Sequence, residues 1–250
     1  KGATEKALEI LRIINPLNCE AELEAIKGSE KKLGESSKNN ESLFSGQYSK
    51  PVIFAVLFAF FNQVSGINAI IYYAPRIFEM AGLGAHSSLL STVGIGLINF
   101  AFTLLALNFI DKVGRRVLML IGSFGFIASL FLVAFTFYTE RFSGMAIPVY
   151  MMVFIAFFAF SQGAVIWVFI SEIFPNQVRA KGQTLGSSTH WVMAALVAFY
   201  FPYFAETFGG AVTFSFFGTM MVLQLLFVWR FMPETKGKSL ESIGDNIVLH

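Results

Sequence analysis

Cysteine, histidine and charged residues are all scarce in this sequence. Its 250 residues include a single cysteine, Cys19, so the chain cannot form an internal disulfide. The three histidines stand apart, and there is neither a nucleophile with a neighbouring base nor a cluster of metal ligands. We therefore expect no enzymatic activity, no metal site, no cofactor and no nucleic acid partner. Charged residues make up 14% of the chain and gather before residue 50 and in the gaps between apolar runs.

Hydrophobic residues, at 55%, are abundant and fall into six long runs. Because a helix needs about 20 mostly apolar residues to cross a bilayer, each run predicts a membrane span. The predicted spans are Pro51 to Met80, Leu89 to Phe109, Val117 to Tyr138, Met145 to Phe174, Thr184 to Phe204 and Val212 to Phe231. We expect an all-α membrane protein in which residues 1–50 form a cytoplasmic linker with short helices, 51–232 a six-span transmembrane bundle in the lipid bilayer, and 233–250 a cytoplasmic tail.

Lysine and arginine indicate the orientation of the bundle. They occupy every second gap and the end of the last run, as Lys112, Arg115, Arg116, Arg179, Lys181, Arg230, Lys236 and Lys238. The opposite face holds only Arg76 and Arg141. By the positive-inside rule both ends of this segment are cytoplasmic, and we expect a multi-pass protein of the cell (inner or plasma) membrane. Because residue 1 is Lys rather than Met, we expect the chain to be a piece of a longer protein.

The first predicted span carries polar side chains at membrane depth, namely Asn62, Gln63, Asn68, Tyr72 and Tyr73. An unpaired amide in hydrocarbon costs several kcal/mol, so such a run is tolerated where it lines a wet cavity or meets polar partners. The pattern indicates the path of a polar solute, and the alternative is that these groups only hold helices together. On an unbroken helix Gln63 and Asn68 would point about 140° apart. Unwinding at Gly66 would bring both amides to one side.

Four motifs follow one another in the order found in a known family. They are Gln63-Val64-Ser65-Gly66-Ile67-Asn68 with Tyr72-Tyr73-Ala74-Pro75, Asp111-Lys112-Val113-Gly114-Arg115-Arg116, Ser171-Glu172-Ile173-Phe174-Pro175 with Val178-Arg179, and Pro233-Glu234-Thr235-Lys236-Gly237. Their order and spacing resemble the sugar porters of the major facilitator superfamily. The resemblance covers the whole chain and implies the carboxy-terminal six-helix bundle of a twelve-helix fold. The amino-terminal six-span half is then a partner that lies outside this sequence.

The resemblance also implies a sugar site. The residues that it implies around the sugar are Gln63, Asn68, Asn62, Asn99, Gly163, Trp167, His190 and Trp191, with Tyr72 and Tyr73 as a gate on the extracellular side. Gly163 belongs to a helix break, although Ala164 stands where many members have proline. The Trp167 indole would offer a sugar ring an apolar face and an N–H donor. His190 replaces a common amide; its protonation would put a charge in the cavity. Ordinary packing of Trp167, or a histidine bonded only within the bundle, are the alternatives.

Charged residues near the cytoplasmic membrane surface have a different implied role. The family resemblance makes Asp111, Arg115, Arg116, Glu172, Arg179 and Glu234 an ion-pair network that latches the inner face shut when the cavity opens outward. Several such pairs together would bias a two-state equilibrium by a few kcal/mol. Topology signalling alone would explain the arginines, but neither Glu172 nor Glu234.

These observations favour transmembrane transport of a monosaccharide, a hexose or a pentose, by alternating access. Proton symport and facilitated diffusion both stay open, because the acidic residue that distinguishes them in the family lies in the other half. Protons are a partner only if the protein is a symporter. A carrier of another polar solute such as a polyol, or a sugar sensor on the same fold, are the alternatives. An organic acid would require a cation in the cavity, and the spans carry no Lys or Arg at membrane depth.

Overall fold

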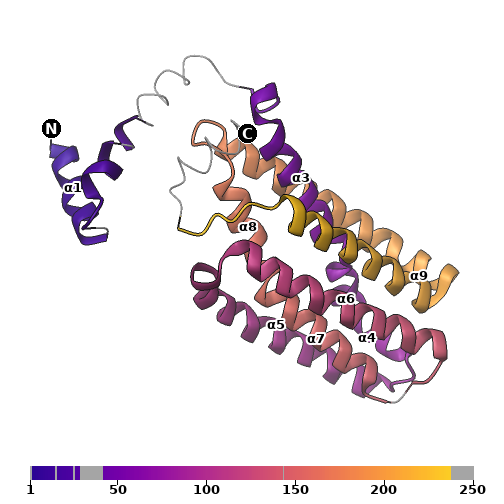
Figure 1. Ribbon diagram of the computed structural model, residues 1–250. Coiled ribbons are helices and arrows are strands. Elements are labelled where there is room, and N and C mark those ends of the chain that lie inside the picture. The colour runs from indigo at the N-terminus through magenta and orange to yellow at the C-terminus, as the bar shows by residue number, and fades with distance from the viewer. Residues whose placement is uncertain (1, 15, 25, 29–41, 143, 238–250) are drawn as a thin grey trace.

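The computed structural model describes residues 2–14, 16–24, 26–28, 42–142 and 144–237. Every regular element in these ranges is a helix, which confirms the predicted all-α fold. The helices are α1 (Gly2–Ile14), η1 (Gly46–Tyr48), α3 (Ser49–Val64), α4 (Ile67–Met80), α5 (Ala85–Val113), α6 (Arg115–Thr139), α7 (Ala146–Phe160), α8 (Gln162–Glu172) and α9 (Arg179–Phe231). From α3 onward they pack into one bundle (Figure 1).

Short helices precede the bundle, as expected. α1 ends at Ile14, two residues before Pro16, whose ring cannot continue a helix, and residues 19–24 and 26–28 are helical as well. These helices lie apart from the bundle (Figure 1). Residues 29–41 of the predicted linker and 238–250 of the predicted tail lie outside the described residues. The boundaries of both segments therefore stay predictions.

Among the described residues, five helical stretches are long and apolar enough to cross a membrane: Gly46–Met80, Ala85–Val113, Arg115–Thr139, Ala146–Glu172 and Arg179–Phe231. The last, α9, has 53 residues, and its length of about 80 Å is more than twice the hydrocarbon thickness of a bilayer. Gly209 interrupts it with φ 76° and ψ 168°, and the chain folds back into a first arm (179–208) and a second arm (210–231) (Figure 1). Each of the six predicted spans thus corresponds to one stretch or one arm.

Two spans are interrupted in their middle. Gly66 separates α3 from α4 with φ 83°, and a Cβ on it would lie 2.6 Å from the ring of Phe217, so both the backbone angle and the packing require glycine. Ser161, with φ −121° and ψ −92°, separates α7 from α8. Helix α6 makes room for this second break, because a Cβ on Gly122 would lie 1.9 Å from Ser161 Oγ. The break forms without proline, since Ala164 lies inside α8.

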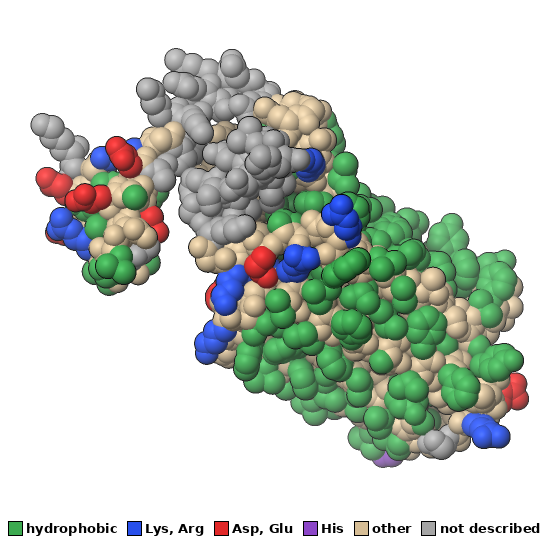
Figure 2. Space-filling model, viewed as in Figure 1, with side chains coloured by type: hydrophobic (Ala, Val, Ile, Leu, Met, Phe, Trp, Pro, Cys, Tyr) green, Lys and Arg blue, Asp and Glu red, His purple; other side chains and the backbone are tan. Residues whose placement is uncertain are grey.

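The bundle is apolar both inside and on its flank. One buried cluster contains Ile70, Phe78, Phe126, Phe154 and Phe214, and a second contains Phe58, Leu118, Phe169, Phe174 and Val228. Outside, hydrophobic side chains cover the flank, while Lys and Arg gather mainly at one end (Figure 2). An apolar flank with a basic end is the surface expected of a helix bundle that sits in lipid.

Candidate functional site

Three amides from the first span form a hydrogen-bonded cluster around the break at Gly66. Gln63 Nε2 donates to Asn62 Oδ1 at 3.0 Å, and Asn68 Nδ2 donates to Gln63 Oε1 at 2.9 Å. Asn62 and Gln63 are fully buried, whereas Asn68 is only partly buried. The left-handed turn at Gly66 reverses the divergence of an unbroken helix and brings Gln63 and Asn68 together. This confirms the prediction that an interruption there would place both amides on one side.

His190, on the first arm of α9, joins this cluster. Gln63 Nε2 lies 3.0 Å from Nδ1 and 3.1 Å from Nε2 of its imidazole. Because an amide nitrogen only donates, the ring nitrogen that it bonds must be unprotonated and accept. The ring of Trp167 meets the imidazole edge-on, with centroids 4.8 Å apart, and that of Trp191 does so at 5.3 Å. The histidine is therefore bonded within the bundle and also partly open to the side on which the tryptophans lie.

The cluster lies on an open face rather than in an enclosed cavity. Trp167 and Trp191 remain 39% and 62% exposed. Asn99, predicted to join the site from α5, is partly buried, and its side chain has no hydrogen bond to another described residue. Gly163 lies in the first turn of α8, where a Cβ would lie 3.0 Å from the ring of Phe158, so it allows close packing at the break.

The two predicted gate tyrosines differ. Tyr73 Oη donates to the Ala198 carbonyl at 3.1 Å, and its ring packs on Phe201 at 5.2 Å, so Tyr73 is fixed to the first arm of α9. Tyr72 is exposed. A further contact joins the same two helices, because Arg76 on α4 forms an ion pair with Glu206. The sequence analysis missed that pair; its charges were visible, but they stand 130 residues apart.

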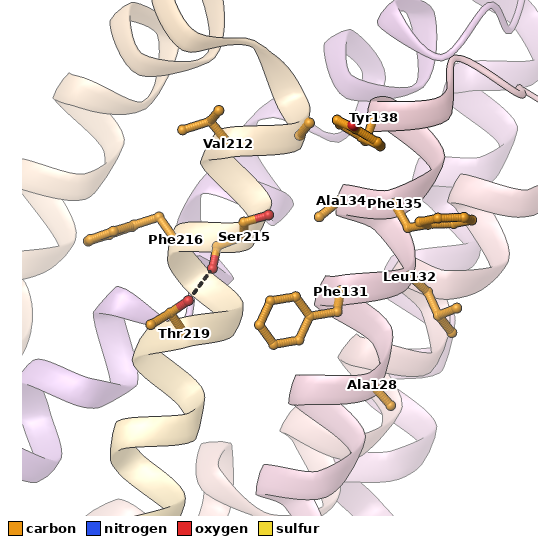
Figure 3. Close-up of a pocket in the computed structure, with 11 residues that line it drawn as sticks. Ala128, Phe131, Leu132, Ala134, Phe135, Tyr138, Val212, Ser215, Phe216 and Thr219 are labelled. Carbon is orange, nitrogen blue, oxygen red and sulfur yellow. Dashed lines mark hydrogen bonds between the residues drawn. The ribbon is translucent and has the colours of Figure 1, made fainter.

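An open groove with a volume of about 1000 Å³ lies elsewhere, between α6 and the second arm of α9 (Figure 3). Its walls are mostly apolar, with Phe131 and Phe135 on one side and Val212 and Phe216 on the other. Hydroxyl groups are the only polar side-chain groups in its lining, and one of them, Thr219 Oγ1, is already bonded to the Ser215 carbonyl at 2.8 Å. A polyhydroxylated solute would find too few partners there, so the amide cluster is the better candidate site.

Charged side chains, two of them nearly buried, join four segments at the basic end of the bundle. The side chains of Arg115 and Glu172 are 10% and 12% exposed and meet at 2.8 Å. Arg115 also pairs with Asp111 at 2.8 Å, and the second oxygen of Glu172 accepts from Thr235 Oγ1 at 2.6 Å. The end of α5, the start of α6, the end of α8 and the segment after α9 are thus joined by one set of ion pairs and hydrogen bonds.

Glu234 contributes to the same region by accepting from backbone nitrogens. Its carboxylate receives the N–H of Arg115 at 2.9 Å and that of Arg116 at 3.1 Å, at the first turn of α6. The amino-terminal end of a helix attracts an anion in this way. Gly114 leaves the space, because a Cβ there would lie 2.6 Å from Glu234 Oε2. Arg116 donates to the Trp229 carbonyl at 2.6 Å, and Arg179 donates to the Phe174 carbonyl at 3.1 Å.

Comparison with known proteins gives the family. A family model described as "Sugar (and other) transporter" matches residues 1–246. An arabinose-proton symporter of Bacillus subtilis is 39% identical over 245 residues, which are 97% of this chain and 52% of that protein. A D-xylose-proton symporter of Escherichia coli K12 is 37% identical over 198 residues, 77% of this chain and 40% of that protein. A glucose facilitated diffusion protein of Zymomonas mobilis is 34% identical over an alignment of 255 residues, which covers 98% of this chain and 52% of that protein.

Solved structures agree with these relatives. The major facilitator superfamily proton:xylose symporter XylE, bound to 6-bromo-6-deoxy-D-glucose, matches with a TM-score of 0.77 and 33% identity, over 97% of this chain and 51% of that one. A double tryptophan mutant of XylE matches with a TM-score of 0.82 and 34% identity, over 97% of this chain and 51% of that one. The chain spans about half the length of the curated relatives that it matches. It belongs to the sugar (and other) transporter family and has the helical fold of the major facilitator superfamily, as the four motifs predicted.

Proposed function

We propose that the protein to which this chain belongs carries a monosaccharide, a hexose or a pentose, across the cell membrane by alternating access. The observation that supports this best is the cluster of Gln63, Asn68, His190 and Trp167 on an open face of a membrane bundle. A sugar ring presents hydroxyls that need donors and acceptors, and apolar C–H faces that pack on an indole. None of these four residues is charged, which favours a neutral solute over an organic acid.

Within the cluster the residues have different proposed roles. Gln63 is fully buried and bonded at both ends, so its part is to orient Asn68 and His190. Asn68 keeps its carbonyl oxygen for a sugar hydroxyl, and Trp167 supplies the apolar contact. Asn62, Asn99, Gly163 and Trp191 complete the proposed site, and Tyr72 and Tyr73 its extracellular gate.

A six-span amino-terminal half is the proposed cover of the open face. The first arm of α9 exposes Gln183, Thr184 and Ser188 close to Trp191, and amides and hydroxyls are poorly suited to lipid. The curated relatives are also about twice as long as this chain. We further propose that both ends of the segment are cytoplasmic, because the basic residues gather at the end of the bundle where α3 begins and α9 ends.

The charges around Arg115 are the proposed latch of the cytoplasmic side. Two nearly buried groups, Arg115 and Glu172, face each other at 2.8 Å, and Glu234 holds the adjacent helix end. Pairs in such partly dry surroundings contribute more than exposed pairs, and several together can bias two states by a few kcal/mol. We infer that the network stabilises the closed cytoplasmic face while the sugar cavity is open outward.

Uptake of labelled glucose and xylose by transport-deficient cells tests the function. Cells that express the complete protein should accumulate at least one of the two sugars, and Asn68→Ala should lower uptake severalfold. Asn108→Ala is the matched control, because this amide is exposed on α5 and bonds only its own helix, at Leu104. Uptake of a polyol but of neither sugar would favour the alternative carrier. Sugar binding without any uptake would favour a sensor.

A further inference from the structure

A second buried polar cluster lies outside the proposed sugar site. It consists of Ser123 on α6, Gln162 at the start of α8 and Gln224 on the second arm of α9, and all three are fully buried. Gln162 Nε2 donates to Gln224 Oε1 at 2.8 Å, and Gln224 Nε2 donates to Ser123 Oγ at 3.3 Å. Ser123 Oγ in turn donates to the Met119 carbonyl at 2.8 Å. Three helices are thereby joined inside an apolar bundle.

Packing stability alone does not explain this cluster. Each side chain donates to the next, from Gln162 through Gln224 and Ser123 to the Met119 carbonyl. No group in this series donates to the side-chain oxygen of Gln162. Gln162 Oε1 is buried and has no hydrogen-bond partner in the described part of the chain. A buried unpaired acceptor is unfavourable, and a pair of apolar side chains of similar shape would be nearly neutral or stabilising in its place.

The cluster begins directly after the break between α7 and α8. Because Ser161 is not helical, the direction of α7 does not determine the direction of α8. α7 itself is held by close contact with α6, where a Cβ on Gly125 would lie 2.1 Å from the ring of Phe157. The side chain of Gln162 is the first one beyond the break, and a hydrogen bond fixes direction in a way that apolar contact does not.

The direction of α8 matters at a distance from Gln162. The helix carries Trp167, whose ring meets His190 with centroids 4.8 Å apart. We propose that Gln162 and Gln224 are a positioning pair, which sets the direction of α8 and thereby the orientation of the Trp167 indole toward His190. Its effect on sugar affinity rests on the proposed function, whereas its effect on the position of Trp167 does not.

Fluorine NMR of the complete protein labelled with 5-fluorotryptophan measures the position of the indole directly. The Trp167 resonance is assigned by its loss in Trp167→Phe. In Gln162→Leu/Gln224→Leu both partners of the hydrogen bond between the two side-chain amides are gone, so we expect thermal stability close to that of the parent. We also expect a shifted or split Trp167 resonance. Ser129→Ala is the matched control; this buried hydroxyl on α6 bonds only its own helix, and its loss should leave the resonance unchanged.

The single variant Gln224→Leu separates positioning from stability. It leaves the side chain of Gln162 without any partner, so it should lower thermal stability and shift the Trp167 resonance. The double variant should regain the thermal stability of the parent but keep the shifted resonance. Sugar half-saturation should rise severalfold in both variants while protein abundance in the double variant stays near that of the parent.

An unchanged Trp167 resonance in the folded double variant would overturn the positioning role. Should the leucine pair fail to fold, Gln162→Met/Gln224→Met provides the same test with unbranched side chains. A shifted resonance in a protein that binds no sugar in any form would support the positioning pair and refute the proposed function instead.

Discussion

Gln63→Ala is the substitution that tests the proposed sugar site most sharply. The side chain of Gln63 is fully buried and bonds Asn62, Asn68 and His190 at 2.9 to 3.1 Å. Alanine would leave three polar groups without this partner, each at a cost of about 1–3 kcal/mol if it stayed dry. Water that enters from the open face would recover part of that cost. We expect sugar binding to weaken by about 1 to 3 kcal/mol, which is roughly a 5-fold to 150-fold rise in Kd.

The buried position of Gln63 also predicts how this loss arises. If Gln63 acts by orienting Asn68, then removal of Gln63 already removes much of what Asn68 contributes. The double variant Gln63→Ala/Asn68→Ala should therefore bind sugar more tightly than the sum of the two single losses implies, by about 0.5 kcal/mol or more. Independent contacts with separate sugar hydroxyls would instead give additive losses.

Equilibrium binding and counterflow in proteoliposomes are suitable assays, with thermal stability measured on the same samples. Asn108→Ala serves again as the control and should bind like the parent. Unchanged affinity in both single variants would refute the site, and additive losses would refute the orienting role of Gln63 while leaving the site in place.

Four further predictions concern other parts of the molecule. Glu172→Gln or Arg115→Ala should shift the carrier toward inward-open states and lower expression, because a stranded buried charge is costly; cysteine labelling of the inner vestibule that matches the parent would contradict this. Gly66→Ala should lower stability by about 1–2 kcal/mol because of the positive φ at this position, and the contact with the Phe217 ring should add to the loss. Gly96→Ala, in open space on a regular helix, should not lower stability, and equal melting temperatures of the two variants would contradict the account of the break. His190→Gln should keep sugar binding and make it less sensitive to acidification, since a protonated imidazole in the parent would turn a donor toward the Gln63 donor. Sugar affinity that falls no more in the parent than in His190→Gln as the pH is lowered would refute this. The chain expressed alone should not take up labelled sugar, and co-expression with the amino-terminal half should restore uptake; robust uptake by this chain alone would refute the two-half proposal.

Local chemistry made some features predictable from the sequence. The break at Gly66 followed from a glycine between two amides that an unbroken helix would have turned apart, and its geometry agrees. The spans followed from run length, because the thickness of a bilayer sets a minimum number of apolar residues. The break near Gly163 was expected from the family resemblance, and the structure locates it at Ser161.

Contacts between distant segments were beyond the same reasoning. Gln224 could be recognised as a polar residue in an apolar run, but its partner Gln162 is 62 residues away on another helix. Which faces of two helices meet depends on the packing of the whole bundle, and no local pattern encodes it. His190 is an intermediate case, because the resemblance placed it in the cavity while its bond to Gln63 required the fold.

The hydrogen bonds of Glu234 have a consequence for biosynthesis. The first turn of α6 receives its anionic cap from a residue 119 positions later in the chain. At about 5–20 residues per second, the ribosome reaches Glu234 roughly 6 to 24 s after it has made Arg115. Until then the first N–H groups of α6 lack the carboxylate that accepts from them in the folded bundle. The basic end of the bundle is therefore completed last, and a chain that stops at Met232 would lack this cap permanently even though all of its spans are present.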